Sequence, residues 1–415
     1  MRRLVVASAI LATLLTTPLS ALAASPAPSP SLSPSPSPTS VAAPDPVRAT
    51  AALEYLLAAQ GPDGSIDGSI GETADYVIGA AAAGFDPGTL HGCLSGAGAL
   101  TFLATASDAA ATDAAKTAKT ILAAIAAGED PTRFGGRDLV KRLMELYHTE
   151  SGSFGDGSTF GQAFGILAVS ASGGAVTTEA TAELVALQDS DGSWSYGKAP
   201  VAAGGGDTNS TAIALIALDK AGVHTADAAA LAYLASQQLA DGGFPYQNST
   251  DFGVPASDPD SDSLVLQDLL AAGVDATSPA WSKGSNNVFT HLAVSQAADG
   301  GYAFPGSPEN AFTTVQVPAA LVRSTYGSVV HPAYEANVPD VRCPNAAPVA
   351  SPTPSAVAFA SVAPSAQPSA SALPGRSEGS SGWSRGQILL AIAVLAGLVL
   401  LVAGWWWFRV RSRKS

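Results

Sequence analysis

The sequence predicts an all-helical protein whose main domain is a closed ring of about six helical hairpins. Three observations support this fold class: a phrase that recurs along the chain, an apolar helix after each copy of it, and two cysteines near the ends of the domain. Self-similarity at a period of about 20 to 50 residues is typical of repeat architectures, in which each unit buries its apolar face against its neighbours.

The recurring phrase is Gln-x-x-Asp-Gly followed by a small or aromatic residue, after an Ala- and Leu-rich stretch. We interpret it as structural: the glycine ends a helix, the aspartate bonds loop amides, and the aromatic residue fills the hairpin junction. The distance between the first copy, at Gly64, and the degenerate copy, at Gly152, fits two units, so one unit lacks the phrase and the total is six. The full copies end at Gly64, Gly192, Gly242 and Gly300, and a degenerate copy ends at Gly152.

The first helix of each unit is predicted from capping residues. Ser, Thr and Asp favour the N-cap, proline favours the first turn, and a carboxylate in that turn suits the helix dipole. These first helices mix polar and apolar residues, so we expect them to face solvent. The predicted starts are Asp45-Pro46, Thr225 with Asp227, and Ser278-Pro279.

The second helix of each unit is apolar nearly all round, as in residues 212–218, so we expect it to be buried. Six buried helices inside six outer ones form either an open solenoid or a closed double ring. The chain has two cysteines, Cys93 and Cys343. In an oxidising compartment a disulfide is the default interpretation, and closure of the ring would bring these two together.

The phrase resembles the QW-type repeat of terpene cyclases and the repeat of the prenyltransferase β-subunit, both α/α toroids. Residues 159–168 and 209–215 are similar to matching segments of the vitamin B12 carriers, transcobalamin and intrinsic factor. Residues 313–321, followed by Ser324, Thr325 and Tyr326, carry the most specific similarity. The resemblance spans about residues 47–326 and implies a six-hairpin toroid.

The resemblance also implies a ligand face at the N-terminal ends of the inner helices, where polar side chains meet a corrin. Amides and hydroxyls suit a ligand rimmed with amides, because these groups donate and accept hydrogen bonds. The carriers close over the corrin with a second, β-rich domain, whereas this chain runs from Pro344 into a linker, so a separate protein would have to supply a lid. The implied ligand-binding residues are Gln162, Asp207, Asn209, Thr211, Asp260 and Gln316.

The ends of the chain predict secretion and a single membrane span. Residues 1–24 have the charged, apolar and small-residue regions of a signal peptide. Residues 25–43 and 346–387 are Pro/Ser-rich, as in a linker and a stalk, and they flank a ring domain at 44–345. Residues 388–408 are uncharged and long enough to cross a bilayer, and the basic tail 409–415 belongs in the cytoplasm. We therefore expect a cell-membrane protein with its ring outside the cytoplasm. A processed sorting signal near Leu373 is the alternative.

Other chemistries find less support in the sequence. A net charge of −14 argues against nucleic acid as a partner. The five histidines show no metal-binding spacing, so we expect no metal site and interpret them as ordinary helix or loop residues. The acidic run 258–262 lacks the adjacent aspartates of a class II cyclase acid. It could bind calcium through alternating carboxylates, although capping an inner helix is the simpler role. No serine shows a partnered His and Asp.

We expect a non-enzymatic, cell-surface toroid that binds a small ligand, with a cobalamin-like corrinoid as the first candidate. One alternative is a scaffold that binds a protein or glycan; a ring centre plugged by Phe and Tyr side chains would favour it. The other is a diverged cyclase- or prenyltransferase-like enzyme; a buried carboxylate with a raised pKa would favour it. Four aromatic residues are predicted to rim the ring centre, namely Trp194, Tyr196, Tyr246 and Phe304.

Overall fold

The computed structural model describes residues 43–93, 96–197, 205–248 and 254–329. These residues belong to one compact unit of the chain, residues 1–348. The predicted signal peptide, stalk, membrane span and basic tail lie outside the described residues, as does Cys343, so those predictions stay untested. Within the described residues, no helix combines the length and hydropathy needed to cross a bilayer.

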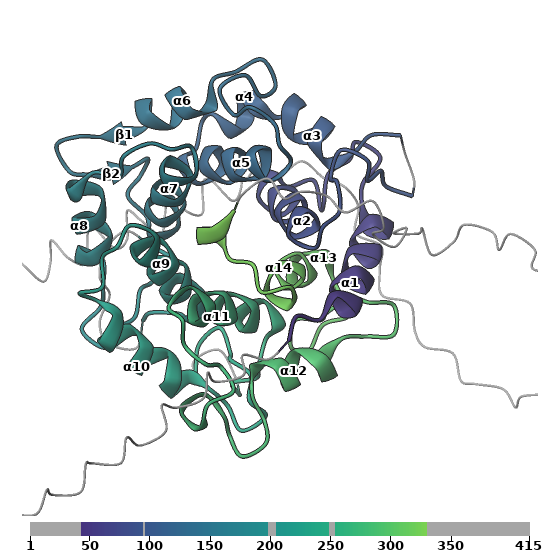
Figure 1. Cartoon of the computed structure of the whole chain (residues 1–415), viewed down its shortest axis with the longest axis vertical. Helices are drawn as coiled ribbons and strands as arrows, with labels where there is room; N and C mark the ends of the chain where they lie inside the picture. Colours follow the sequence, from purple (N-terminus) through teal and green to yellow (C-terminus); the bar gives the residue numbers. More distant parts are fainter. Residues whose placement is uncertain (1–42, 94–95, 198–204, 249–253, 330–415) are drawn as a thin grey trace, which may run out of the picture. The chain divides into compact units, whose positions relative to one another are not determined.

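The described chain forms two concentric rings of helices (Figure 1). The inner ring consists of α2 (Ile70–Ala82), α5 (Ala114–Ala126), α7 (Thr159–Ala171), α9 (Thr208–Lys220), α11 (Pro259–Ala271) and α13 with α14 (Ala311–Thr314, Val317–Leu321). The outer ring consists of α1 (Pro46–Ala59), α3 with α4 (Ala99–Thr105, Ser107–Ala110), α6 (Leu139–Glu145), α8 (Thr178–Ala186), α10 (Asp227–Gln237) and α12 (Val288–Ser295). A short hairpin, β1 (Tyr147–His148) with β2 (Ser153–Phe154), joins α6 to α7.

The inner ring is closed. Each inner helix packs against the next, from α2 through α5, α7, α9 and α11 to α14, and α14 packs against α2. The outer helix α1 also packs against α13 and α14, so the first and last units meet. These contacts confirm the α/α toroid of six hairpins and exclude the open solenoid for the described part of the chain.

The inner helices are buried because they are apolar around most of their circumference. In α9 every residue from Thr208 to Leu218 is buried, and the three alanines among them, Ala212, Ala214 and Ala217, let neighbouring helices approach closely. Side-chain N-caps start these helices: Asp207 caps α9 and Ser158 caps α7.

The recurring phrase forms the junction between consecutive outer helices. The Gln238 amide donates to the carbonyl of Gly242 and to that of Trp281 in the following unit, both at 2.9 Å. The Asp241 carboxylate accepts from the Gly243 amide, which confirms its loop-bonding role. The phrase glycines have φ angles of 77–93° and lie directly against the next outer helix, where any Cβ would clash.

The same junction closes the ring. The Gln296 amide donates to the carbonyl of Arg48 on α1 at 2.9 Å, and Gly300 lies against Ala51 of that helix. The last unit therefore meets the first through the contact that joins neighbouring units elsewhere.

Two predicted helix starts were wrong. Ser278-Pro279 begins only the short 3₁₀ helix η2 (Pro279–Trp281), and the outer helix α12 starts after Asn287. Asn287 makes a full capping box with Thr290, a stronger start than Ser278 offers. Helix α10 follows Ala226, and the structure gives no side-chain cap there, so Thr225 is not its N-cap.

The chain then turns into the middle of the ring after α14. Arg323 takes a left-handed backbone conformation, with a φ of 65°, and makes this turn. The short 3₁₀ helix η3 (Tyr326–Ser328) follows, and it lies within the inner ring (Figure 1, yellow-green).

Candidate functional site

Three polar side chains and one aromatic side chain converge on the ring axis from the sixth position of inner-ring elements, counted from the start of each helix. These are Asp75 on α2, Lys119 on α5, Phe164 on α7 and Gln316, which follows α13. The Lys119 ammonium pairs with Asp75 Oδ2 at 2.7 Å and lies 4.8 Å from the Phe164 ring centre. Gln316 Nε2 donates to the same carboxylate oxygen at 3.0 Å. The sixth residues thus form one cluster around Asp75.

Tyr326 of η3 fills the space between these side chains. Its hydroxyl lies 2.7 Å from Asp75 Oδ1 and 2.8 Å from Gln316 Oε1. Its ring meets Phe164 edge-on at 5.1 Å between ring centres, and its backbone N–H donates to Gln267 Oε1. The side chain is 4% exposed. The centre of the ring is therefore occupied by the protein's own chain.

The second residue of each inner helix lies one turn nearer the N-terminal end than the sixth residue and on the same face of the helix. Going round the ring, α7, α9, α11 and α13 place Phe160, Asn209, Asp260 and Phe312 there. We call this set the ring mouth. On the opposite side, α2 and α5 carry only Gly71 and Ala115 at this position, and a Cβ added to Gly71 would meet almost nothing.

At the ring mouth, Asn209 and Asp260 form a buried polar pair. Asn209 Nδ2 donates to Asp260 Oδ2 at 2.7 Å. Asn209 is only 7% exposed, and its other amide atom, Oδ1, is buried and has no hydrogen-bond partner among the described residues. Leaving such an acceptor unpaired costs about 1–3 kcal/mol, so native structures usually supply a partner for it.

Burial raises the pKa of the carboxyls at this end of the ring. Burial and the charges of Asp258 and Asp75 raise the pKa of the Asp260 carboxyl well above its usual value. Burial raises the pKa of Asp258 to about 7 and that of Asp207 to about 6. The raised pKa favours the protonated form of Asp260.

Aromatic side chains extend the ring mouth toward solvent. The Tyr196 ring is 65% exposed and lies 5.2 Å from that of Phe160, and Phe312 is 52% exposed. Tyr246 is partly exposed and hydrogen-bonds to Asp207. Trp194, in contrast, is fully buried and donates to the Leu184 carbonyl, so its predicted place on the rim was wrong.

The structure brings some of the predicted ligand residues together and separates others. Asn209 and Asp260 meet at the ring mouth, and Gln316 lies in the cluster below them. Gln162 and Thr211 are the fourth residues of their helices and point to the hairpin junctions. Gln162 bonds the backbone of Phe154, Gly152 and Ala180, and Thr211 accepts from the Trp194 amide. Asp207 caps α9. A ligand contact with Gln162 or Thr211 would have to break these bonds.

Sequence reasoning missed Asp75, Lys119 and Tyr326. Alignment of the six inner helices at their fourth residues would have placed Asp75 and Lys119 beside Gln316. No repeat signal reaches Tyr326, because it follows the last unit.

One histidine departs from the ordinary role expected of it. His291 on α12 is 9% exposed, and its Nδ1 pairs with Asp262, the fully buried fourth residue of α11. Its Nε2 lies 3.3 Å from Ser295 Oγ and 3.8 Å from Asp241. Burial alone would lower the pKa of His291, but the hydrogen bond to Asp262 and the charges of Asp262, Asp241 and Asp258 raise it. The raised pKa favours the protonated imidazole, which is an ion-pair partner for Asp262.

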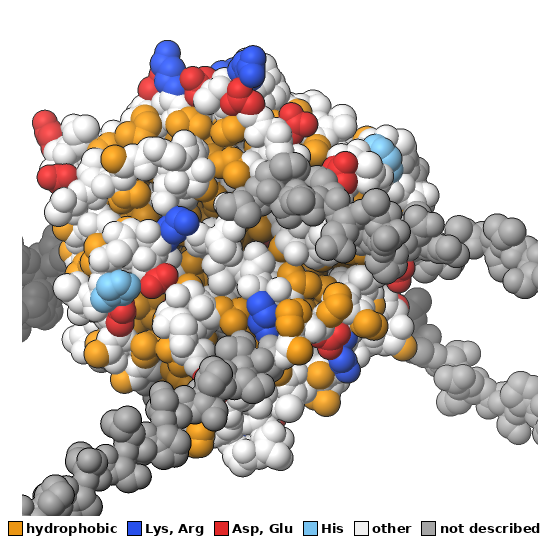
Figure 2. Space-filling model, in the orientation of Figure 1, with side chains coloured by type: hydrophobic (Ala, Val, Ile, Leu, Met, Phe, Trp, Pro, Cys, Tyr) orange, Lys and Arg blue, Asp and Glu red, His pale blue; other side chains and the backbone are white. Residues whose placement is uncertain are grey.

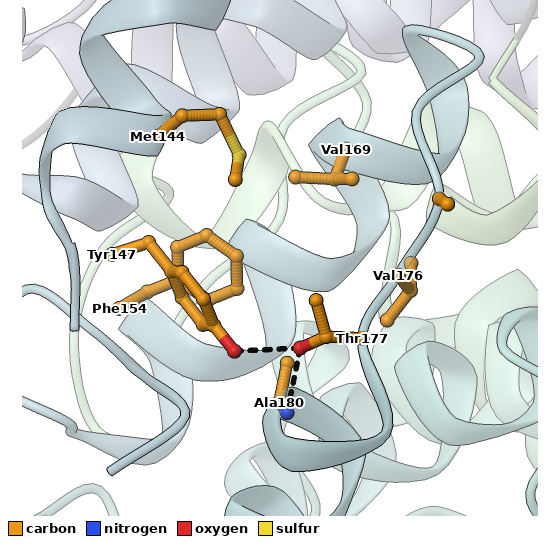
Figure 3. A pocket seen from close by; sticks show the side chains of 8 residues that line it. Met144, Tyr147, Phe154, Val169, Val176, Thr177 and Ala180 are labelled. Atoms are coloured by element: carbon orange, nitrogen blue, oxygen red, sulfur yellow. Dashed lines mark hydrogen bonds between the residues drawn. The ribbon is translucent and has the colours of Figure 1, made fainter. Parts of the chain in front are cut away.

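Other sites on the described chain are small or absent. The described residues hold no group of three His, Cys, Asp or Glu side chains placed to bind a metal ion, and this includes the run 258–262. A pocket between α6, α7 and α8 is apolar and has about 10 Å³ of internal space, room for roughly one water molecule (Figure 3). Two of its lining residues, Tyr147 and Thr177, form a hydrogen bond to each other at 2.6 Å. On the face seen in Figure 2, Lys and Arg side chains are few and scattered.

The sequence matches no known family profile and no curated relative. Several solved structures are similar in architecture. The type II terpene cyclase MstE from Scytonema is 14% identical, covers 67% of this chain and 97% of its own, and has a TM-score of 0.47. Haptocorrin in complex with Cbi is 12% identical, covers 69% of this chain and 69% of its own, and has a TM-score of 0.44. An unsaturated glucuronyl hydrolase from a Bacillus species is 10% identical, covers 67% of this chain and 95% of its own, and scores 0.45. All three scores lie below 0.5, so the toroid assignment rests on the helix contacts given above.

Proposed function

We propose that this protein is a non-enzymatic binding protein and that its ligand is a small molecule held at the ring mouth. The observation that carries the proposal is the buried Asn209 Oδ1, which has no partner among the described residues and lies beside Asp260. Exposed aromatic rings at Tyr196 and Phe312 extend this end of the ring. A few convergent polar groups framed by aromatic side chains are typical of small-molecule sites.

The occupied centre favours binding over the mouth and not deep in the ring. Tyr326 blocks the axis and is held by hydrogen bonds to Asp75, Gln316 and Gln267. A ligand would therefore rest on Tyr326 as a floor, with its upper side open to solvent or to a separate lid protein.

A corrinoid is the first ligand to test, because of the sequence resemblance to the vitamin B12 carriers. We expect the full-length chain, purified in detergent, to bind cobalamin or cobinamide at micromolar concentration or tighter in calorimetric titration. Asn209→Ala and Asp260→Asn should weaken binding about tenfold or more. Gln162→Ala tests the junction instead and should affect stability first. Absence of heat and of a thermal shift at millimolar corrinoid would remove the corrinoid from this proposal.

A diverged enzyme is a second candidate, favoured by one observation. Asp260 is a buried carboxyl whose pKa is raised well above its usual value, and a raised carboxyl pKa is common among general acids. Its test is product formation from an isoprenoid substrate, followed by mass spectrometry and abolished in Asp260→Asn. A scaffold is favoured by the Tyr326 plug instead. It would bind a protein or glycan equally well with and without Asn209.

We further propose that the ring domain is displayed outside the cell, tethered by residues 388–408. Protease treatment of intact cells should remove residues 44–345 and spare the basic tail. Protection of the ring domain would place it on the other side of the membrane.

A further inference from the structure

The unsatisfied group of the ring mouth is a hydrogen-bond acceptor. Asn209 Oδ1 is buried without a partner among the described residues. The Asn209 donor is already used, since Nδ2 bonds Asp260. A ligand that completes this group must therefore bring a donor, that is, an N–H or O–H group.

The ionisable side chains around the mouth are mainly carboxyls. Asp207, Asp258 and Asp260 lie at the N-terminal ends of α9 and α11, and Asp75 lies on α2. Among the described residues, Lys119 is the cation at the ring centre, and its ammonium is already paired with Asp75 at 2.7 Å. An anionic ligand would meet carboxyls here and no unpaired cation among the described residues of this end, so we expect the mouth to disfavour it.

The aromatic residues provide flat apolar surface. Phe160 and Tyr196 lie 5.2 Å apart in a tilted pair on the α7 side, and Phe312 stands on the α13 side, 52% exposed. A ligand between them would pack an apolar ring face on these side chains and turn its donors toward Asn209.

From these features we infer that the ring mouth takes an uncharged or positively charged ligand that presents N–H donors and an apolar ring face. The inference rests on the proposed binding function and names the ligand chemistry of that same site. It excludes diphosphates, uronic acids and other anions. Two sources share this chemistry: an amide-rimmed corrinoid, and a sugar chain carrying acetamido or amino groups.

The experiment compares four probes on the full-length chain by calorimetric titration: cobinamide, a chitin tetramer (neutral, acetamido), a chitosan tetramer (cationic, amino) and a galacturonate tetramer (anionic). We expect cobinamide or the two amino-sugar tetramers to bind, and the galacturonate tetramer to bind at least tenfold more weakly at low salt. Which neutral or cationic probe binds identifies the source of the ligand.

Variants locate the binding. Asn209→Ala should weaken the productive probe about tenfold or more, and Tyr196→Ala or Phe312→Ala should weaken it several-fold. Asn209→Asp adds a carboxylate of the same shape and should raise the preference for the amino over the acetamido tetramer. Val294→Ala, on the solvent side of the outer helix α12 and 80% exposed, is the matched control and should change nothing. Thermal melts of each variant check that it folds.

The outcomes separate the two proposals. Tight galacturonate binding that is lost in Asn209→Ala would keep the mouth as a binding site and overturn the charge selection. Binding of any probe that survives Asn209→Ala would place the ligand elsewhere and overturn the proposed function as well. If cobinamide and both amino-sugar tetramers fail to bind at millimolar concentration, the donor chemistry inferred here is wrong.

Discussion

The fourth residue of five inner helices accepts a hydrogen bond from a backbone amide of the junction, and the accepting group differs from helix to helix. Thr73, Thr211 and Thr314 accept the junction amide through a hydroxyl, whereas Gln162 uses an amide and Asp262 a carboxylate. Gln162 reaches further than threonine and also satisfies the carbonyls of Gly152 and Ala180. Gln162, which the sequence resemblance implied as a ligand residue, therefore bonds the same kind of junction carbonyls that the phrase glutamine Gln238 bonds at its own junction.

Two substitutions of Gln162 should lower the stability of the fold by different amounts. Gln162→Leu leaves the Phe154 amide and two carbonyls unpaired in the core, so we expect the free energy of unfolding to fall by about 2–4 kcal/mol. Gln162→Thr keeps the bond to Phe154 and should lose less. Denaturant unfolding followed by circular dichroism measures both. Equal losses would mean that the bonds to Gly152 and Ala180 contribute nothing.

A phrase glycine, Gly192, and a glycine at the end of α9, Gly222, offer a matched pair of backbone tests. Gly192 has a φ of 93°, and a Cβ there would stand 2.4 Å from the Ala229 carbonyl oxygen. Gly222 also has a positive φ, 72°, but a Cβ there meets nothing within 4 Å. We expect Gly192→Ala to cost about 3 kcal/mol or more and Gly222→Ala about 1 kcal/mol in thermal or denaturant unfolding. A similar cost at both positions would show that strain, and not contact with α10, decides the residue.

At the scale of elements, the contact between α11 and α12 is the junction that carries charge. Asp262 is fully buried, holds the Phe244 amide and pairs with His291, whereas the equivalent residues of α2, α7, α9 and α13 are neutral. Asp241 and Asp258 also act on His291, which explains why its pKa is raised in spite of burial.

Asp262→Thr converts this junction to the form found in three other units. We expect the pKa of His291 to drop, because its hydrogen-bond partner and the nearest negative charge are gone. An NMR titration of the imidazole protons measures the change, with His224, on the exposed surface, as the internal control. An unchanged pKa would assign the effect to Asp241 and Asp258.

The six hairpins were predictable from the sequence, because the phrase and the apolar helix of each unit repeat along the chain. Helix α12 was misplaced because the Ser278-Pro279 pair at the start of η2 also matches the sequence pattern of a helix start, although Asn287 makes the stronger cap. The site needed the register within each helix: Asn209 and Asp260 share the second position, whereas Gln162 and Thr211 turn away at the fourth. Tyr326 lies beyond the last repeat, and only the three-dimensional path of the chain brings it to Asp75.

At the scale of the whole molecule, the buried carboxyls set how stability depends on pH. Burial raises the pKa of Asp207 to about 6, that of Asp258 to about 7, and those of Asp260 and Asp268 well above the usual value. A carboxyl whose pKa is higher in the folded than in the unfolded state stabilises the fold below its unfolded value, near 4. That contribution is lost as the pH rises through the folded value.

We therefore expect the free energy of unfolding to fall as the pH rises from about 4.5 to 8. His291 acts in the same direction, since its raised pKa also favours the protonated folded state. Urea unfolding at half-unit steps of pH measures the slope, and Asp258→Asn should flatten it around pH 7. A stability that increases over this range would contradict the raised values.

The predicted disulfide belongs to the same scale. Cys93 packs against the core after α2, and Cys343 lies outside the described residues, so the pairing stays a prediction. A bond that closes a loop of this length should stabilise the fold by about 3–5 kcal/mol. Thiol labelling of the denatured chain, before and after reduction, tests it together with the shift in melting temperature. Labelling of both cysteines before reduction would rule the bond out.

The closing contact between Gln296 and Arg48 makes the two ends of the described chain neighbours, and Arg323 reaches back to the Ala43 carbonyl at 2.8 Å. Since the last junction is built like the others, the ring has no structural first unit. A circular permutant that joins residues 43 and 329 through a short glycine-rich linker, with new termini opened at the exposed turn around Gly173, should fold to the same ring. The order in which the units are synthesised would then be a property of the gene and not of the fold.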